Sequence, residues 1–146
     1  MITTWLTADN IQIVDSISDW KQAITLSSQP LLAKKAIAED YIQAIFNSHH
    51  ELGPYYVLAP GLAMPHARPE QGALKNGLSL LHIKQGVSFD AEENDPIYVV
   101  IMLCALSGDE HINMITALAD IFSDDERLSA LLKASSMETF QAVING

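Results

Sequence analysis

The sequence has 146 residues, 49% of them hydrophobic and 18% charged, a composition that suits one domain with a substantial core and excludes a disordered chain. Acidic side chains number 18 against 8 basic ones, so the formal net charge is −10, which disfavours binding to nucleic acids and to anionic membranes. A basic protein, attracted by electrostatic steering, is the kind of partner that this charge favours.

The N-terminal part predicts a strand followed by a helix. Ile11–Val14 alternates between two faces as a short strand does. Ser18 or Asp19 then supplies the N-cap of a helix with apolar residues at helical spacing. Pro30 should end or kink this helix, because proline lacks the backbone N–H that a helix interior uses.

A second helix is predicted from about Ala38 to near Gly53-Pro54. Its apolar stripe consists of Tyr41, Ile42, Ile45 and Phe46. His49 and His50 lie at its end, where the helix dipole favours partial positive charge, and we expect them on a solvated face.

In the rest of the chain, the spacing of apolar residues is typical first of strands and then of helices. Strand-like segments lie at Tyr55–Ala59, Gly77–Lys84 and Ile97–Ala105. Helical segments lie at Asp109–Phe122, Asp125–Ala134 and Met137–Ile144. Helices on both sides of a small sheet predict an α/β fold: a single-domain sandwich of a small mixed β-sheet covered by helices on both faces, spanning residues 1–146.

Targeting and membrane-spanning segments are not expected. Met1–Leu6 lacks a basic region followed by an apolar stretch, so we expect no signal peptide. The longest apolar run, Ile97–Leu106, has ten residues, about half of the ~20 that a membrane helix needs. Cys104 lies inside this run and is expected to be a buried thiol. We therefore expect a cytoplasmic protein without disulfides.

Gly61–His66 is the most unusual local segment. Met64 is held extended by the proline that follows it, and Pro65 has its own φ fixed, so His66 is delivered from a stiff segment. The surface turn expected at residues 67–70 places His66 at a strand end with access to solvent. The residues alone allow either a functional histidine or a turn histidine.

His111 is the second candidate. Ser107 and Glu110 have the spacing of a capping box, which puts His111 in the first turns of a helix. An imidazole near a helix N-terminus tends to stay neutral and can donate a hydrogen bond, while the helix end favours an anion. A core histidine bonded to a backbone carbonyl remains the alternative.

The two histidines become more informative together. The Ile97–Leu106 strand delivers the His111 helix at its carboxyl end, where ligands bind in open α/β sheets. If His66 ends a neighbouring strand at that edge, the two imidazoles meet. One would attack phosphorus and the other would donate a hydrogen bond to the phosphoryl oxygens.

Other kinds of site are disfavoured. The histidines lack zinc-site spacing, so we expect no metal, and His82 in its strand is taken as structural. The acidic segment Asp90–Pro96 lacks the pattern of a calcium loop and predicts a solvated loop. No Walker loop, GxGxxG or nucleophile elbow occurs, so a phosphoryl group would have to come from another protein.

At Gly61-Leu62-Ala63-Met64-Pro65-His66 the chain resembles enzyme IIA of the mannitol/fructose type in the bacterial sugar phosphotransferase system. The resemblance runs from about Ile11 to the C-terminus and includes residues 38–44 and 111–119. Within that family the chain looks most similar to the ascorbate-specific branch. The segments that carry this finer resemblance are Gly53-Pro54-Tyr55-Tyr56, Ala59-Pro60-Gly61, Ala67-Arg68-Pro69-Glu70 and Glu93-Asn94-Asp95-Pro96.

The resemblance implies a phosphocarrier that needs no cofactor. Phospho-HPr would donate to His66, by analogy at Nε2, with His111 in support. The phosphoryl group would then pass to a cysteine of enzyme IIB and, through membrane enzyme IIC, to a sugar that the resemblance indicates is L-ascorbate. Many mannitol-type relatives carry an arginine where this chain reads Asn47–His50, and Arg68 is our candidate for its replacement.

Two alternatives stay open at this point. One is a regulatory IIA protein that controls partners by its phosphorylation state. The other is a non-enzymatic binding domain in which His66 and His111 are structural. The apolar N-terminus with Trp5 offers a contact surface for a homodimer.

Overall fold

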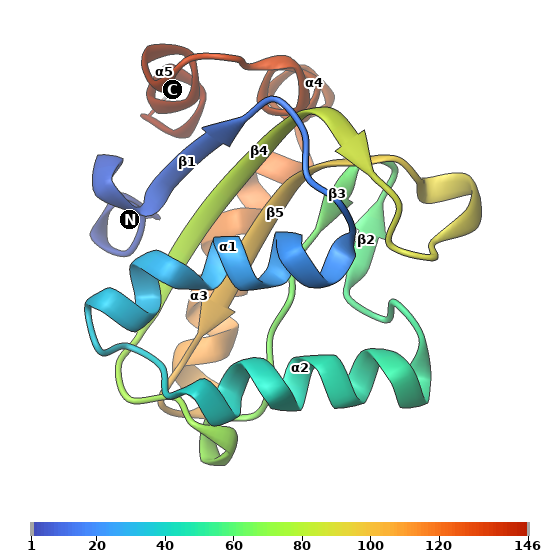
Figure 1. The fold of residues 1–146 in the computed structure, drawn as a ribbon. Helices are drawn as coiled ribbons and strands as arrows, with labels where there is room; N and C mark the ends of the chain where they lie inside the picture. The colour runs from blue at the N-terminus through green and yellow to red at the C-terminus, as the bar shows by residue number, and fades with distance from the viewer. Residues whose placement is uncertain (1, 146) are drawn as a thin grey trace.

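The computed structural model describes residues 2–145; Met1 and Gly146, the ends of the predicted domain 1–146, lie outside them. Within the described residues, five strands form one mixed sheet in the order β1-β4-β5-β3-β2 (Figure 1). Their bounds are β1 Ile11–Val14, β2 Val57–Ala59, β3 Leu62–Ala63, β4 Gly77–Val87 and β5 Ile97–Cys104. The β1–β4 and β3–β5 pairs are parallel, whereas β4–β5 and β2–β3 are antiparallel.

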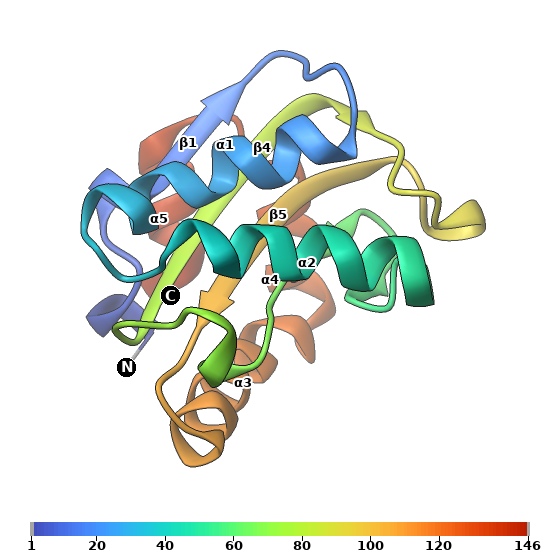
Figure 2. The same ribbon diagram turned by 60° about the horizontal axis from the view of Figure 1, so that its bottom comes forward.

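Helices cover both faces of the sheet (Figures 1 and 2). On one face lie α1 Trp20–Ala33 and α2 Glu39–Leu52, and on the other α3 Gly108–Phe122, α4 Asp125–Lys133 and α5 Met137–Asn145. Short 3₁₀ turns occur at Ile2–Thr4, Ala8–Asn10, Pro69–Gln71 and Glu92–Asn94. The predicted fold class, a small mixed sheet sandwiched between helices, is confirmed.

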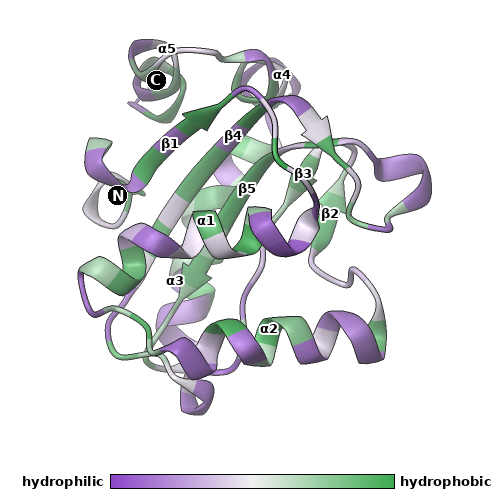
Figure 3. Ribbon diagram, in the orientation of Figure 1, coloured by the Kyte–Doolittle hydropathy of each residue, from purple (hydrophilic) through white to green (hydrophobic). Residues whose placement is uncertain are grey.

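The adjacent strands β4 and β5 contribute side chains to two hydrophobic cores, one on each face of the sheet. Along β4, Leu78 and Leu80 face the α3–α5 side, while Leu81 and Ile83 face α1 and α2, because successive side chains of a strand point to opposite faces. Residues Val99–Cys104 of β5 are buried on both sides, and Figure 3 shows β5 as a mainly hydrophobic strand, whereas α1 and α2 carry both hydrophobic and hydrophilic residues. Burial of each such aliphatic side chain contributes about 1.5–3 kcal/mol.

Asp19 is the N-cap of α1, and its carboxylate accepts a hydrogen bond from the Gln22 amide at 2.8 Å. The prediction that Pro30 ends or kinks this helix is wrong on the end point, because α1 continues to Ala33. A proline at position 30 leaves the carbonyl of Leu26 without its helical donor. The side-chain amide of Gln12 on β1 donates to that carbonyl at 2.8 Å, so the helix keeps its last turn.

The apolar side chains of the N-terminus pack against the protein's own hydrophobic core. Ile2 and Leu6 are buried in the core, Trp5 is partly buried against it, and the first 3₁₀ turn packs on α3 and α5. These side chains therefore do not form the free contact surface that we expected for a homodimer. No helix within residues 2–145 is long and apolar enough to cross a membrane.

Candidate functional site

His66 and His111 meet at the carboxyl end of β5. Their ring centroids are 5.1 Å apart and their planes are inclined at 58°. The carbonyl of Pro65 accepts a hydrogen bond from the Leu103 amide at 3.1 Å, which fixes the segment before His66 to the C-terminal end of β5. Figure 2 shows the arrowhead of β5 beside this segment, just before the chain enters α3. The expected adjacency of the two imidazoles is thus present in the fold.

The imidazole of His66 is oriented by its own backbone. Its Nδ1 lies 2.9 Å from the carbonyl oxygen of Met64, which can only accept a hydrogen bond. In the neutral ring the proton therefore resides on Nδ1, and the lone pair is on Nε2. The side chain is half-buried and lines an open cavity, so Nε2 is the nitrogen available for chemistry.

Two tyrosines that were not predicted as site residues fix the backbone around His66. The hydroxyl of Tyr41 accepts from the Ala67 amide at 3.0 Å and donates to the Leu103 carbonyl at 2.6 Å, joining α2, the His66 segment and β5. Its complete burial raises the pKa of Tyr41, so this hydroxyl stays protonated. The hydroxyl of Tyr55 donates to the carbonyl of His66 at 2.8 Å.

His111 lies in the first turn of α3. Ser107 is the N-cap, and its hydroxyl accepts from the Glu110 amide at 3.3 Å, as predicted. The second half of the expected capping box is absent, because the Glu110 carboxylate instead accepts from the side-chain amide of Asn76 at 3.2 Å. Burial, and then the neighbouring His66, lower the pKa of His111 and favour its neutral form.

The cavity beside the two histidines has a volume of about 920 Å³ and lies between α2, the segment after His66 and the start of α3. His66, Arg68 and His111 all line it, so the fold brings the three predicted site residues together. The Arg68 side chain is 74% exposed, and its Nε lies 3.3 Å from a carboxylate oxygen of Glu70. Within residues 2–145 this guanidinium makes no second ion pair.

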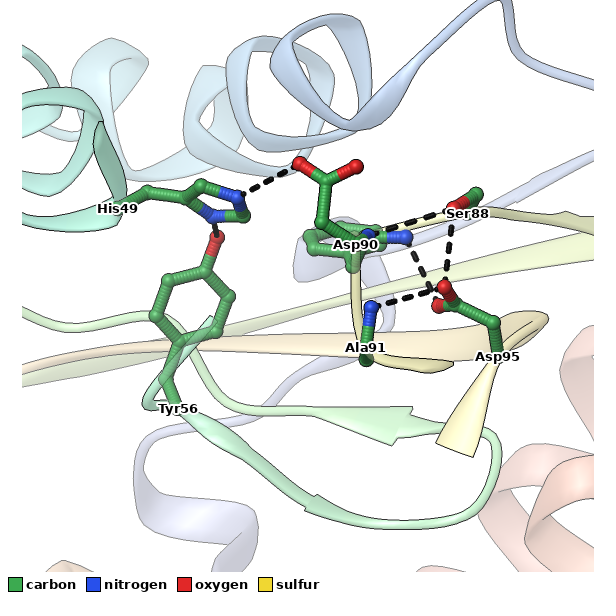
Figure 4. A network of polar contacts seen from close by, with 7 residues as sticks. His49, Tyr56, Ser88, Asp90, Ala91 and Asp95 are labelled. Carbon is green, nitrogen blue, oxygen red and sulfur yellow. Dashed lines mark hydrogen bonds and ion pairs between the residues drawn. The ribbon is translucent and has the colours of Figure 1, made fainter. Parts of the chain in front are cut away.

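The expectation that His49 and His50 both lie on a solvated face is wrong for His49. His50 is exposed as predicted, but His49 is buried against Trp20, with stacked rings whose centroids are 3.6 Å apart. Its Nδ1 lies 2.6 Å from the hydroxyl of Tyr56 and its Nε2 lies 3.3 Å from the carboxylate of Asp90 (Figure 4). Burial lowers the pKa of His49, so the neutral ring accepts from Tyr56 and donates to Asp90. The helical stripe Tyr41, Ile45, His49 was the available sequence signal.

The acidic segment before β5 is only partly a solvated loop. Glu92 and Glu93 are exposed, but the Asp95 carboxylate accepts hydrogen bonds from the Ser88 hydroxyl and from the amides of Phe89 and Ala91, all within 2.9 Å (Figure 4). Two of the carboxylates in this segment, Asp90 and Asp95, therefore have structural partners. Within residues 2–145, no three His, Cys, Asp or Glu side chains converge as a metal site would require.

The remaining predicted structural residues are buried. Cys104 is completely buried in β5, and burial raises the pKa of its thiol to about 12, which keeps it from acting as a nucleophile. His82 lies buried in β4, with its ring 5.2 Å from that of Phe140.

Comparison with known proteins gives consistent results. Residues 4–146 match the family described as phosphoenolpyruvate-dependent sugar phosphotransferase system, EIIA 2. The chain is 44% identical to the mannitol-specific cryptic phosphotransferase enzyme IIA component of Escherichia coli K12, over 99% of this chain and 97% of that protein. It is 34% identical to the ascorbate-specific PTS system EIIA component of the same strain, over 84% and 80%.

Solved structures agree with these sequence relatives. The solution structure of the Escherichia coli mannitol-specific cryptic enzyme IIA superposes with a TM-score of 0.92, covering 99% of both chains at 44% identity. The complex of enzyme IIAMTL with phosphorylated enzyme IIBMTL from Escherichia coli matches with a TM-score of 0.80 at 27% identity, over 95% of this chain and 96% of that one.

Proposed function

This chain belongs to the EIIA 2 family of the phosphoenolpyruvate-dependent sugar phosphotransferase system, a family of phosphotransferase components, and we propose that it carries the phosphoryl group on Nε2 of His66. The observation that carries this proposal is the 2.9 Å contact between His66 Nδ1 and the Met64 carbonyl, which leaves Nε2 as the basic nitrogen at the cavity. An unprotonated, oriented lone pair is what attack on phosphorus requires.

The transfer itself exchanges one nitrogen–phosphorus bond for another. Nε2 of His66 attacks the phosphorus of phospho-HPr, the bond to the donor imidazole breaks, and the donor nitrogen keeps that electron pair. The Met64 carbonyl then faces an imidazole that has gained positive character, and its Nδ1–H bond strengthens accordingly. Transfer onward runs in the same way, with a cysteine thiolate of enzyme IIB as the attacking group.

His111 and Arg68 are assigned supporting roles toward the phosphoryl oxygens. A neutral His111 next to the His66 ring has an N–H to donate, and the N-terminus of α3 adds the positive end of its dipole. Arg68 lines the same cavity with an exposed side chain, and the phosphoryl dianion would draw its guanidinium away from Glu70.

The surface around the cavity suits protein partners. Four apolar side chains that are more than two-fifths exposed lie on the elements that form the site, on α2, on the loop after it, on the β5–α3 loop and on α3: Leu52, Tyr55, Leu106 and Ile112. Exposed apolar groups around a polar centre are typical of docking surfaces. HPr as donor and enzyme IIB as acceptor are the partners that we propose, and the IIA–IIB complex of the mannitol system supports the second. Membrane enzyme IIC would be reached only through IIB.

The relatives named above differ in the sugar for which they are specific, so the transported sugar is a separate part of the proposal. The sequence resemblance pointed to L-ascorbate, whereas identity is higher with the mannitol-specific cryptic component, 44% against 34%. We therefore place mannitol first and L-ascorbate second as transported substrates. Uptake of each labelled sugar in cells that carry the chain with its own IIB and IIC would decide between them.

The proposal is tested by phosphoryl transfer from phosphoenolpyruvate through enzyme I and HPr. We expect acid-labile, base-stable label on the wild-type chain, none on His66→Ala, and slower labelling of His111→Ala. His50→Ala, which changes an exposed histidine of α2, is the matched control and should label normally. A folded wild-type chain that takes no label from active phospho-HPr would identify a binding domain instead. Label that never reaches a IIB cysteine would identify a regulatory IIA protein.

A further inference from the structure

A second cavity, of about 640 Å³, opens at the amino end of β5 and shares no lining residue with the first. It lies between the β2–β3 turn at Pro60-Gly61, the C-terminal half of β4 and the C-terminal end of α4. Tyr98 lines it, and Leu103 at the His66 site lies five positions further along β5, which is ~16 Å of strand. This cavity is therefore separate from the phosphoryl site.

The backbone at Gly61 keeps the cavity open. Gly61 has a φ of +83°, which favours glycine, and its backbone is fixed because its amide donates to the Asn94 carbonyl at 3.0 Å and its carbonyl accepts from the Tyr98 amide at 2.9 Å. A Cβ at this position would lie 3.3 Å from Leu132 and 3.4 Å from the Tyr98 ring. The glycine thus leaves Tyr98 and Leu132 as an apolar wall.

His82 adds a buried polar group without a partner. It lines the cavity with only 3% of its surface exposed, and its buried Nδ1 has no hydrogen-bond partner within the described residues. Buried polar side chains are nearly always hydrogen-bonded, and leaving one unpaired is destabilising. A bound molecule would supply the partner that the protein lacks.

The charges around the cavity favour an anion. Lys84 and Lys133 line it, two of the 8 basic residues of a chain whose net charge is −10. Asp95 is the one carboxylate among the lining residues, and its oxygens are already occupied by the Ser88 hydroxyl and two backbone amides. Lys84 also lies 3.5 Å from Asp15, whereas Lys133 has no ion pair among the described residues.

We propose that this cavity is a binding site for a small organic anion. The apolar body of the ligand packs on Tyr98 and Leu132, its carboxylate or phosphate lies by Lys84 and Lys133, and His82 hydrogen bonds to a polar substituent. The site takes no part in phosphoryl transfer.

The test is an NMR titration of the ¹⁵N-labelled chain with benzoate, with phenyl phosphate, and with benzyl alcohol as the neutral analogue. Both anions should shift the amides of Gly61, Tyr98 and Ser135 with saturation, and benzyl alcohol should bind about tenfold more weakly. Lys133→Gln, an exposed substitution that should not affect folding, should weaken both anions about fivefold. Lys21→Gln on the exposed surface of α1 is the matched control and should change neither.

Three results would overturn the proposal. One is the absence of saturable shifts with benzoate. Another is equal binding of benzyl alcohol and of both anions. The third is phenyl phosphate shifting only amides next to His66 and His111, which would assign its binding to the phosphoryl site.

Discussion

His66 and His49 both have Nδ1 held by a single oxygen, yet the two bonds run in opposite directions. At His66 the partner is the Met64 carbonyl, which accepts, so the proton sits on Nδ1 and Nε2 keeps a lone pair at the cavity. At His49 the partner is the Tyr56 hydroxyl, which donates, so the proton sits on Nε2 and is directed at Asp90. In our proposal, His66 is the reactive histidine and His49 a structural one, because they differ in the partner of Nδ1 and in the open space at the cavity that only His66 lines.

The largest effect on stability should come from His49→Ala. The change empties a buried, stacked position and leaves the Tyr56 hydroxyl unpaired, so we expect a loss of about 2–4 kcal/mol in the free energy of unfolding. Urea denaturation followed by tryptophan fluorescence measures it, and His50→Ala should cost less than about 0.5 kcal/mol. The folded fraction of His49→Ala should still take label from phospho-HPr. Loss of labelling in a folded variant would contradict the structural role that we assign to His49.

Tyr41→Phe should have an intermediate effect that reaches both properties. It removes the hydroxyl that joins Ala67 to Leu103, which should cost about 1–3 kcal/mol of stability and slow phosphoryl transfer by loosening the His66 segment. Thermal unfolding and rapid-quench labelling measure the two effects. Tyr98→Phe, whose hydroxyl has no bond within residues 2–145, is the control and should change neither by much. Unchanged transfer in Tyr41→Phe would show that the hydroxyl stabilises without positioning.

Arg68→Ala should produce a smaller change, confined to the rate. Because the guanidinium is 74% exposed, we expect transfer to slow by about two- to fivefold, with stability unaffected. Glu70→Gln, which frees Arg68 from its ion pair, should leave the rate equal or slightly raised. An unchanged rate in Arg68→Ala would remove this residue from the site.

The mildest prediction concerns pH. Burial lowers the pKa of His49 and of His111 below the ordinary value of 6.5, so the unfolded chain binds more protons than the folded one in mildly acidic solution. The stability that these neutral rings contribute is present above pH 6.5 and is lost as the pH falls through their folded pKa values. Urea midpoints should therefore decrease gradually from pH 7.5 to 5.5, and less steeply in His49→Ala than in the wild type. An identical slope in the variant would contradict the role given to His49.

Local chemistry made the helix limits predictable, since caps and breakers act within a few residues. Asp19, Ser107 and Gly53 start or end helices as expected. The persistence of α1 past Pro30 was not predictable, because the group that satisfies the freed carbonyl comes from Gln12 on another element. The strand expected at 55–59 begins only at Val57, because a turn bond from the Val57 amide to the Pro54 carbonyl occupies the residues between.

The residues of the candidate site also fall into a group that local sequence patterns indicated and a group that they did not. Proline, capping and strand patterns close to His66 and His111 in the sequence made them candidates, and the family resemblance then assigned them to the site. Tyr41 and Tyr55 were missed because their hydroxyls act on backbone groups 11 to 62 residues away. For the same reason, His49 was assigned to a solvated face although it extends the inward stripe of α2. Sequence spacing placed residues on faces, but only the packed fold showed which atoms they meet there.

The hydroxyl of Tyr41 has a consequence for how the chain can be assayed. It joins residues 41, 67 and 103, so the ring of His66 is presented correctly only when distant parts of the chain have come together. A partly folded molecule would hold the same histidine without its orientation and would accept phosphate poorly. The stoichiometry of rapid labelling would then count native molecules in a preparation, and unfolded copies in a cell would draw few phosphoryl groups away from transport.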